Sequence, residues 1–126
     1  MNPITAEWIT KAEGDFATAE RELGVTVSPN YDAVCFHAQQ CAEKYLKARL
    51  QESGVQFGKT HDLPTLLNLA LSVESIWEAL LTDMQTLSTY AVAYRYPGDS
   101  ADKEDAEEAL EKCRNFREIA RKSLGL

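Results

Sequence analysis

The chain of 126 residues lacks three features, and each absence excludes a class of protein. Its three cysteines are odd in number and form no Cys-x-x-Cys pair, which argues against a disulfide framework or a zinc site. We expect them to be reduced, buried small residues. No stretch approaches the roughly 18 consecutive apolar residues that a membrane-spanning helix needs. The sequence therefore predicts no membrane association.

An excess of positive charge is also lacking. Thirteen Lys and Arg stand against 20 Asp and Glu, which gives a net charge of −7. This balance argues against sequence-independent binding of duplex DNA, which depends on neutralising phosphates, although it leaves room for a local basic patch. The N-terminal residues include early acids and no apolar core of signal-peptide length, so we expect a cytoplasmic protein.

The apolar residues that are present recur at helical spacing almost everywhere, and no segment is typical of a strand. This periodicity predicts an all-α protein, with residues 1–126 forming a single domain. We expect an antiparallel up-and-down bundle of four long helices plus one short helix. The helices are expected from Pro3 to Gly24, from Ser28-Pro29 to just before Gly54, and over 63–71, 75–94 and 101–124.

The second predicted helix has an unusual polar face. At about 100° per residue, four polar side chains fall opposite its apolar stripe, with one phenylalanine among them and one glutamate at their edge. The polar residues are His37, Gln40, Lys44 and Lys47, and the other two are Phe36 and Glu43. A scattered exposed aromatic is common. We favour the alternative that a second subunit, a segment of the same chain or a partner covers this face.

Two further polar groups follow along the chain. In Lys59-Thr60-His61-Asp62, Thr60 or Asp62 is a natural N-cap of the short helix, which leaves Lys59 and His61 unexplained. In Tyr94-Arg95-Tyr96-Pro97-Gly98, two tyrosines flank an arginine and are suited to stacking bases or clamping a phosphate. The alternative is that the tyrosines pack the end of the bundle while Arg95 pairs with a nearby acid.

At these residues the chain resembles a known family. The stretch FHAQQCAEKYLKA at 36–48, KTHDL at 59–63 and RYPG at 95–98 resembles, in this order, the landmarks of HEPN domains (higher eukaryotes and prokaryotes nucleotide-binding). Trp8 and the stretch Asp15-Phe16-x-x-Ala19 fit as well. The resemblance implies a helical bundle that commonly dimerises. It also implies a minimal nucleotidyltransferase partner in a two-component system of the toxin–antitoxin type.

Many members of that family are metal-independent ribonucleases that use an arginine followed four to six residues later by a histidine. The only histidines here are His37 and His61, and neither follows an arginine at that spacing. We therefore do not carry nuclease activity over from the family, and no catalytic residue is assigned. The chain resembles the subgroup that has RYPG in place of the motif, and this resemblance implies nucleotide binding instead.

The first functional hypothesis is a nucleotide- or RNA-phosphate-binding homodimer that acts with a nucleotidyltransferase partner. Phe36 and Glu43 are the predicted interface residues. No cofactor is expected, and no metal site either, because neither histidine follows a glutamate at the three-residue spacing of di-metal bundles. The predicted ligand-binding residues are His37, Gln40, Lys44, Lys47, Lys59, His61, Arg95 and Tyr96.

Two alternatives stay open. One is a metal-independent ribonuclease, in which His61 or His37 is the general acid–base group and Arg95 with Lys44 holds the phosphate. The other is a purely structural interaction module, in which the polar groups of the second helix form an interface. The interaction module predicts that Lys44→Ala weakens association and changes no ligand affinity, whereas the binding hypothesis predicts the opposite pattern.

Overall fold

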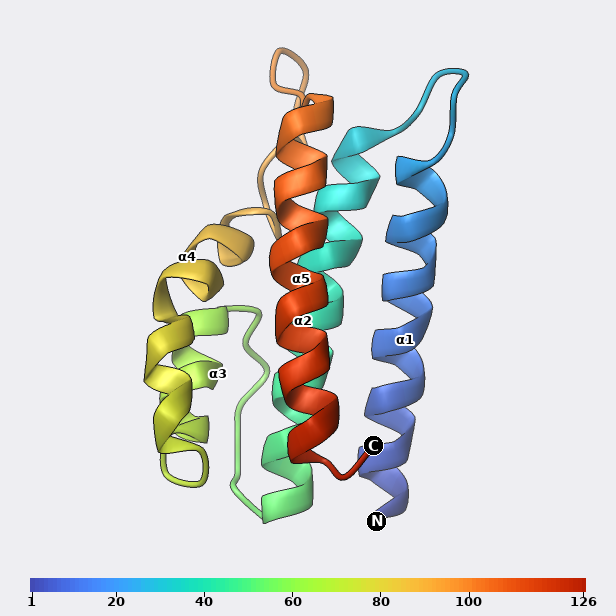
Figure 1. Ribbon diagram of the computed structural model, residues 1–126. Coiled ribbons are helices and arrows are strands. Elements are labelled where there is room, and N and C mark those ends of the chain that lie inside the picture. Colours follow the sequence, from blue (N-terminus) through green and yellow to red (C-terminus); the bar gives the residue numbers. More distant parts are fainter.

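The computed structural model describes residues 1–126 and contains no strand. Figure 1 shows α1, α2 and α5 side by side, with α3 and α4 against the other flank of the α2–α5 pair. The prediction of an all-α bundle of five helices is confirmed. The elements are α1 (Pro3–Leu23), α2 (Tyr31–Ser53), α3 (Leu63–Ala70), the 3₁₀ turn η1 (Ser75–Leu80), α4 (Leu81–Thr89) and α5 (Lys103–Ser123).

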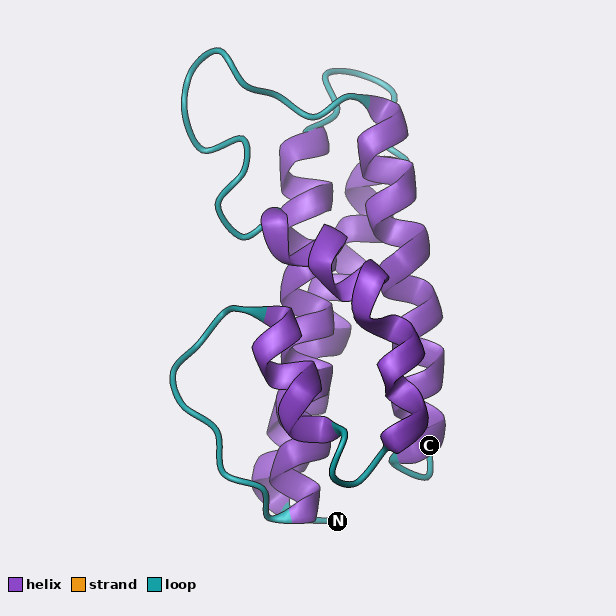
Figure 2. Cartoon of the chain, turned by 90° about the vertical axis from the view of Figure 1, so that its left-hand side faces the viewer, coloured by secondary structure: helices purple, strands orange, loops and turns teal.

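The helix directions differ in one respect from a strict up-and-down order, because α2 and α5 run parallel to each other. Asp32 accepts a hydrogen bond from Ala101 near the start of both helices, and Arg49 donates to Ser123 near the end of both. The extended segment 54–62 makes this possible by returning along the bundle before α3 begins (Figure 2). It has no apolar period, so its path could not be read from the sequence.

The fourth helix is shorter than the expected span of 75–94. Its first part is the 3₁₀ turn, in which Trp77 is buried against Phe116 while the neighbouring Ile76 is exposed. The α-helical part ends at Thr89, and Tyr94 has a left-handed backbone with φ of 63°. A left-handed residue cannot continue a right-handed helix, so the chain leaves the bundle here.

Side-chain caps fix where the other helices begin. Asn2 accepts from the Ile4 N–H at the start of α1. Asp62, one of the two predicted caps of the short helix, accepts from the Thr65 N–H at the start of α3. The predicted start of the second helix at Ser28-Pro29 is wrong. Asn30 is the cap, and its side chain accepts from the Ala33 N–H at 3.0 Å.

The core lies between α1, α2 and α5 and extends under α3 and α4. The α2 helix lies at its centre, and about half of its residues are buried. All three cysteines are free and buried, as predicted. None of the helices combines the length and the apolar character needed to cross a membrane.

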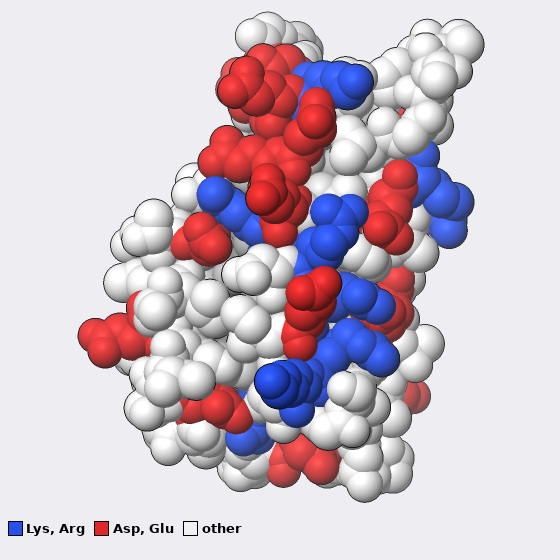
Figure 3. All heavy atoms as spheres, viewed as in Figure 1, with Lys and Arg blue, Asp and Glu red and all other residues white.

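Charges are segregated along α5. Acidic side chains gather over its first half, and basic side chains lie over its second half and toward α1 (Figure 3). This order favours the helix dipole. Arg117 pairs with Glu13 of α1 at 2.6 Å, and Arg114 pairs with Glu20 at 3.4 Å. The Arg117 hydrogen bond also holds the pKa of Glu13 below its ordinary value of 4.5. We therefore attribute a structural role to these ion pairs between α1 and α5.

Candidate functional site

The predicted ligand-binding residues do not converge on one place. His37 and Lys44 meet at one carboxylate, and Lys47 and His61 meet at another. Arg95 lines a groove with His37. Lys59 and Tyr96 are exposed, and no hydrogen bond or ion pair joins them to either group. The structure thus contains two separate clusters rather than a single polar site.

The first cluster is centred on Asp15 of α1. His37 Nδ1 lies 2.7 Å from Asp15 Oδ1, and Lys44 Nζ lies 2.5 Å from Asp15 Oδ2. Asp15 is 8% exposed, because α1 presses this side against α2. A carboxylate acceptor places the ring proton on Nδ1 and leaves Nε2 of a neutral His37 as a proton acceptor.

A groove of 270 Å³ opens beside His37. Its walls come from the start of α2 and from the turn after α4, and they include Phe36, Tyr94 and Arg95. The Asp32 carboxylate also lines the groove and accepts the Ala101 N–H at 2.7 Å. Phe36 is exposed and lies edge-on to the His37 ring, with the ring centroids 5.4 Å apart. The volume lies just below the roughly 300 Å³ at which small-molecule sites begin.

Tyr94, which lines this groove, has an uncommon backbone conformation. A large side chain at φ of 63° is disfavoured by about 1–2 kcal/mol. The ring stacks on Tyr90 at 6.1 Å between centroids, and burial raises the pKa of the Tyr94 hydroxyl, which therefore stays protonated. Such outliers concentrate at functional sites. Next to it, Arg95 is exposed at the groove.

The second cluster is centred on Glu43. Its carboxylate is 3% exposed and lies 3.1 Å from Lys47 Nζ and 3.0 Å from His61 Nδ1. Gln39 donates both to Glu43 and to the His61 carbonyl oxygen. The Lys47 ammonium also lies over the Trp8 ring, 5.4 Å from its centroid. This part of the α2 face is therefore covered by α1 and by the segment before α3, that is, by the same chain.

Two residues predicted to bind a ligand, Lys47 and Gln40, instead contact other side chains of this chain. Lys47 is 6% exposed and paired, so its charge is satisfied inside the chain. Gln40 donates to the side chain of Gln39, which places it in the same hydrogen-bond network. The ligand roles predicted for these residues, and the interface role predicted for Glu43, stay predictions.

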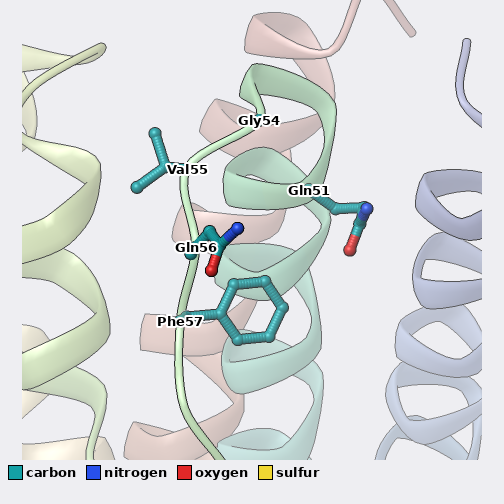
Figure 4. A pocket seen from close by; sticks show the side chains of 5 residues that line it. All are labelled: Gln51, Gly54, Val55, Gln56 and Phe57. Carbon is teal, nitrogen blue, oxygen red and sulfur yellow. The ribbon is translucent and has the colours of Figure 1, made fainter.

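A larger pocket of 360 Å³ lies at the C-terminal end of α2 and along the extended segment after it (Figure 4). Its lining has no ionisable side chain, and it is formed by Gln51, Gly54, Val55, Gln56 and Phe57. A pocket of this composition holds neither a phosphate-binding cation nor an acid–base group. The groove beside His37 is therefore the better candidate.

Sequence reasoning missed the role of Asp15 and the backbone conformation of Tyr94, although it names the Tyr94 side chain as suited to stacking bases. It treats Asp15 only as part of the family landmark, because no pattern along α1 shows that this carboxylate is covered by α2. The left-handed backbone of Tyr94 has no sequence signal, because tyrosine is not a residue that favours this conformation.

Comparison with known proteins agrees with this fold. The model of the HEPN domain family matches residues 5–123. A protein of Methanocaldococcus jannaschii named "Putative toxin MJ1304" is 30% identical, over 89% of this chain and 82% of its own length. The crystal structure of TT1696 from Thermus thermophilus has a TM-score of 0.80 at 24% identity, and ST0689, an archaeal HEPN homologue, has 0.72 at 22%. Both alignments cover 94% of this chain and 96% of the other. The chain belongs to the HEPN domain family.

Proposed function

We propose that this protein binds a nucleotide or a single-stranded RNA through the groove beside His37. The observation that carries the proposal is the left-handed Tyr94, which is held at an energetic cost where its ring and Arg95 line one groove with Phe36 and His37. Backbone strain of this kind persists only where the surrounding structure imposes the conformation. A role in ligand binding would explain why the left-handed conformation of Tyr94 is retained.

The side chains of the groove suit a nucleotide. Aromatic rings such as Phe36 and Tyr94 offer faces on which bases stack, worth about 1–3 kcal/mol per base. Arg95 supplies a planar cation for phosphate, and its exposure leaves its donors free for that contact. The net charge of −7 disfavours a long duplex, so a short or single-stranded ligand fits better.

The biological role that we propose is that of a toxin-like member of a two-component system. Support comes from the 30% identical relative, whose name is "Putative toxin MJ1304". On this proposal the protein is a homodimer that acts with a minimal nucleotidyltransferase partner. The exposed Phe36 is a suitable contact for a second subunit, because aromatic residues are enriched in interfaces.

A binding titration tests the groove. We expect fluorescence anisotropy of a labelled single-stranded RNA of about 12 nucleotides to show saturable binding that Arg95→Ala weakens at least about tenfold. The matched control is Arg21→Ala, because Arg21 is also an exposed arginine but lies at the end of α1, outside the groove. Equal losses in both variants would point to general charge attraction, and no binding of RNA, ATP or GTP would refute the proposal.

A further inference from the structure

We propose that a second groove, between α3 and α4, docks an amphipathic helix of a protein partner, with apolar side chains on one side and Lys or Arg beside them. The groove has a volume of 140 Å³ and is lined by Pro64, Leu67, Asn68, Leu71, Glu78 and Leu81. This volume is well below the roughly 300 Å³ of small-molecule sites, so it suits inserted side chains and not a free ligand. The two grooves share no lining residue, and the proposal does not depend on nucleotide binding.

The α3 helix is apolar on two sides, and the bundle fully buries one of them. The buried side consists of Leu63, Leu66, Leu67 and Ala70. Pro64, Asn68 and Leu71 follow one another at steps of four and three, so they share a second side of the helix. Pro64 and Leu71 are only half-buried there, and all three line the groove. A helix that is apolar almost all round is ordinarily covered on every side, so α3 has one side left for another element.

The η1 turn and the start of α4 extend this apolar surface on the flank that faces the viewer in Figure 2. Side chains three residues apart in a 3₁₀ turn point the same way, so Trp77 and Leu80 both pack toward the core. Ile76 lies on an outer side and is 80% exposed, and Leu81 is 41% exposed at the groove itself. Large apolar side chains that gather in the open beside a groove mark an interaction surface.

The charges of this surface select the partner. Residues 60–94, which include α3, η1 and α4, contain no Lys or Arg. Asp62 caps α3, and Glu74 and Asp83 pair with basic side chains of α2 and α5. Glu78 is exposed at the groove and makes no ion pair within the chain. A helix that presents Lys or Arg beside its apolar stripe would supply the missing cation, which is how charge complementarity fixes a partner.

A second copy of this chain suits the groove less well. Two copies related by a two-fold axis set the same surface against itself. Glu78 of each copy would then meet a surface that has acids and no base of its own. Like charges that face each other in an interface disfavour association, so we assign the groove to a different chain.

The test measures the binding of a fluorescein-labelled synthetic peptide to the full chain by fluorescence anisotropy. The peptide has about 18 residues, with leucines at helical spacing and lysines beside them, a length at which a helix forms in part on its own. A control peptide carries glutamates in place of the lysines. We expect saturable binding of the lysine peptide and at least about tenfold weaker binding of the glutamate peptide.

Two substitutions separate docking in the groove from general charge attraction. Leu81→Asp should weaken binding of the lysine peptide about tenfold or more, because it places a charge where apolar side chains dock. An acid is well tolerated at the first residue of α4, so the fold should persist in a circular dichroism melt. Glu78→Lys, at an exposed position, should weaken the lysine peptide and strengthen the glutamate peptide. The matched control is Val27→Asp, in the loop between α1 and α2, which should change neither affinity.

The outcomes are distinct. If the wild-type protein did not bind the lysine peptide, or if Leu81→Asp and Val27→Asp both bound it as the wild type does, the proposal would be overturned. In the second case the net charge of −7 would explain the binding. A dimer that Leu81→Asp converts to monomers in sedimentation, without any peptide binding, would assign this face to a second copy instead. None of these results bears on RNA binding in the groove beside His37.

Discussion

Two histidines in this small bundle make the same kind of contact, from Nδ1 to a carboxylate, but lie in different surroundings. His37 holds Asp15 through Nδ1 at 2.7 Å, and His61 holds Glu43 through Nδ1 at 3.0 Å. One ring lines a groove, and the other lies mostly in solvent on the segment before α3. A histidine–carboxylate contact is therefore not by itself a functional sign, and the neighbourhood of the free ring nitrogen decides what it can do.

The lysines of the two clusters differ in a similar way, in how far each side chain is exposed. Lys44 and Lys47 each pair with the carboxylate of one cluster, yet their side chains are 20% and 8% exposed. A buried charge whose partner is removed destabilises a protein far more than a partly solvated one. The two clusters should therefore respond unequally to the same kind of substitution.

The largest expected effect is on the Glu43 cluster. Glu43→Gln leaves the Lys47 ammonium without its anion in a covered site, and we expect the free energy of unfolding to fall by about 3–5 kcal/mol in urea denaturation. Adding Lys47→Met to this variant should recover much of that loss, because the unpaired charge is then gone. A loss below about 1 kcal/mol would contradict the view that this cluster is structural.

The corresponding change in the groove cluster should cost less. Asp15→Asn removes the anion from Lys44, which keeps partial access to water, so we expect a loss of about 1–3 kcal/mol in the same urea experiment. If Asp15→Asn proved more damaging than Glu43→Gln, the assignment of the second cluster to stability and the first to function would be reversed.

The histidines should rank in the opposite order and on a smaller scale, because His61 is the more exposed of the two rings. His61→Ala removes a mostly exposed ring, and Lys47 and Gln39 still satisfy Glu43, so we expect a stability change within about 0.5 kcal/mol. His37→Ala removes a half-buried partner of Asp15 and should cost about 1 kcal/mol. Thermal melts of the two variants side by side measure the difference.

Some of this contrast could be read from the sequence. Helical periodicity and capping residues predict the bundle and the starts of α1 and α3. The Glu43–Lys47 pair also follows from its i,i+4 spacing on one helix. The Asp15 contacts could not be derived, because the register of α1 against α2 decides which carboxylate meets which face.

The packing of helices against one another could not be predicted from the sequence for a similar reason. A helical wheel places His37, Lys44 and Lys47 on one side, but it does not say that Trp8 and Asp15 of α1 cover that side. Nor does any pattern in 54–62 show that this segment returns along the bundle and makes α5 parallel to α2. Apolar spacing reports which side of a helix is buried, not what buries it.

The last prediction concerns the strained residue of the groove, where two opposing stability effects should nearly cancel. Tyr94→Asn replaces tyrosine with a residue that tolerates the left-handed backbone, so relief of strain should offset the lost stacking on Tyr90 to within about 1 kcal/mol. RNA affinity should nevertheless fall, by the roughly 1–3 kcal/mol that one stacked base is worth. Ser28 supplies the control, because it is the other non-glycine residue with positive φ and does not line the groove. Ser28→Gly should therefore stabilise the protein slightly and leave RNA affinity unchanged. If both variants behaved alike in the anisotropy titration, the strain at Tyr94 would be a feature of the loop and not of binding.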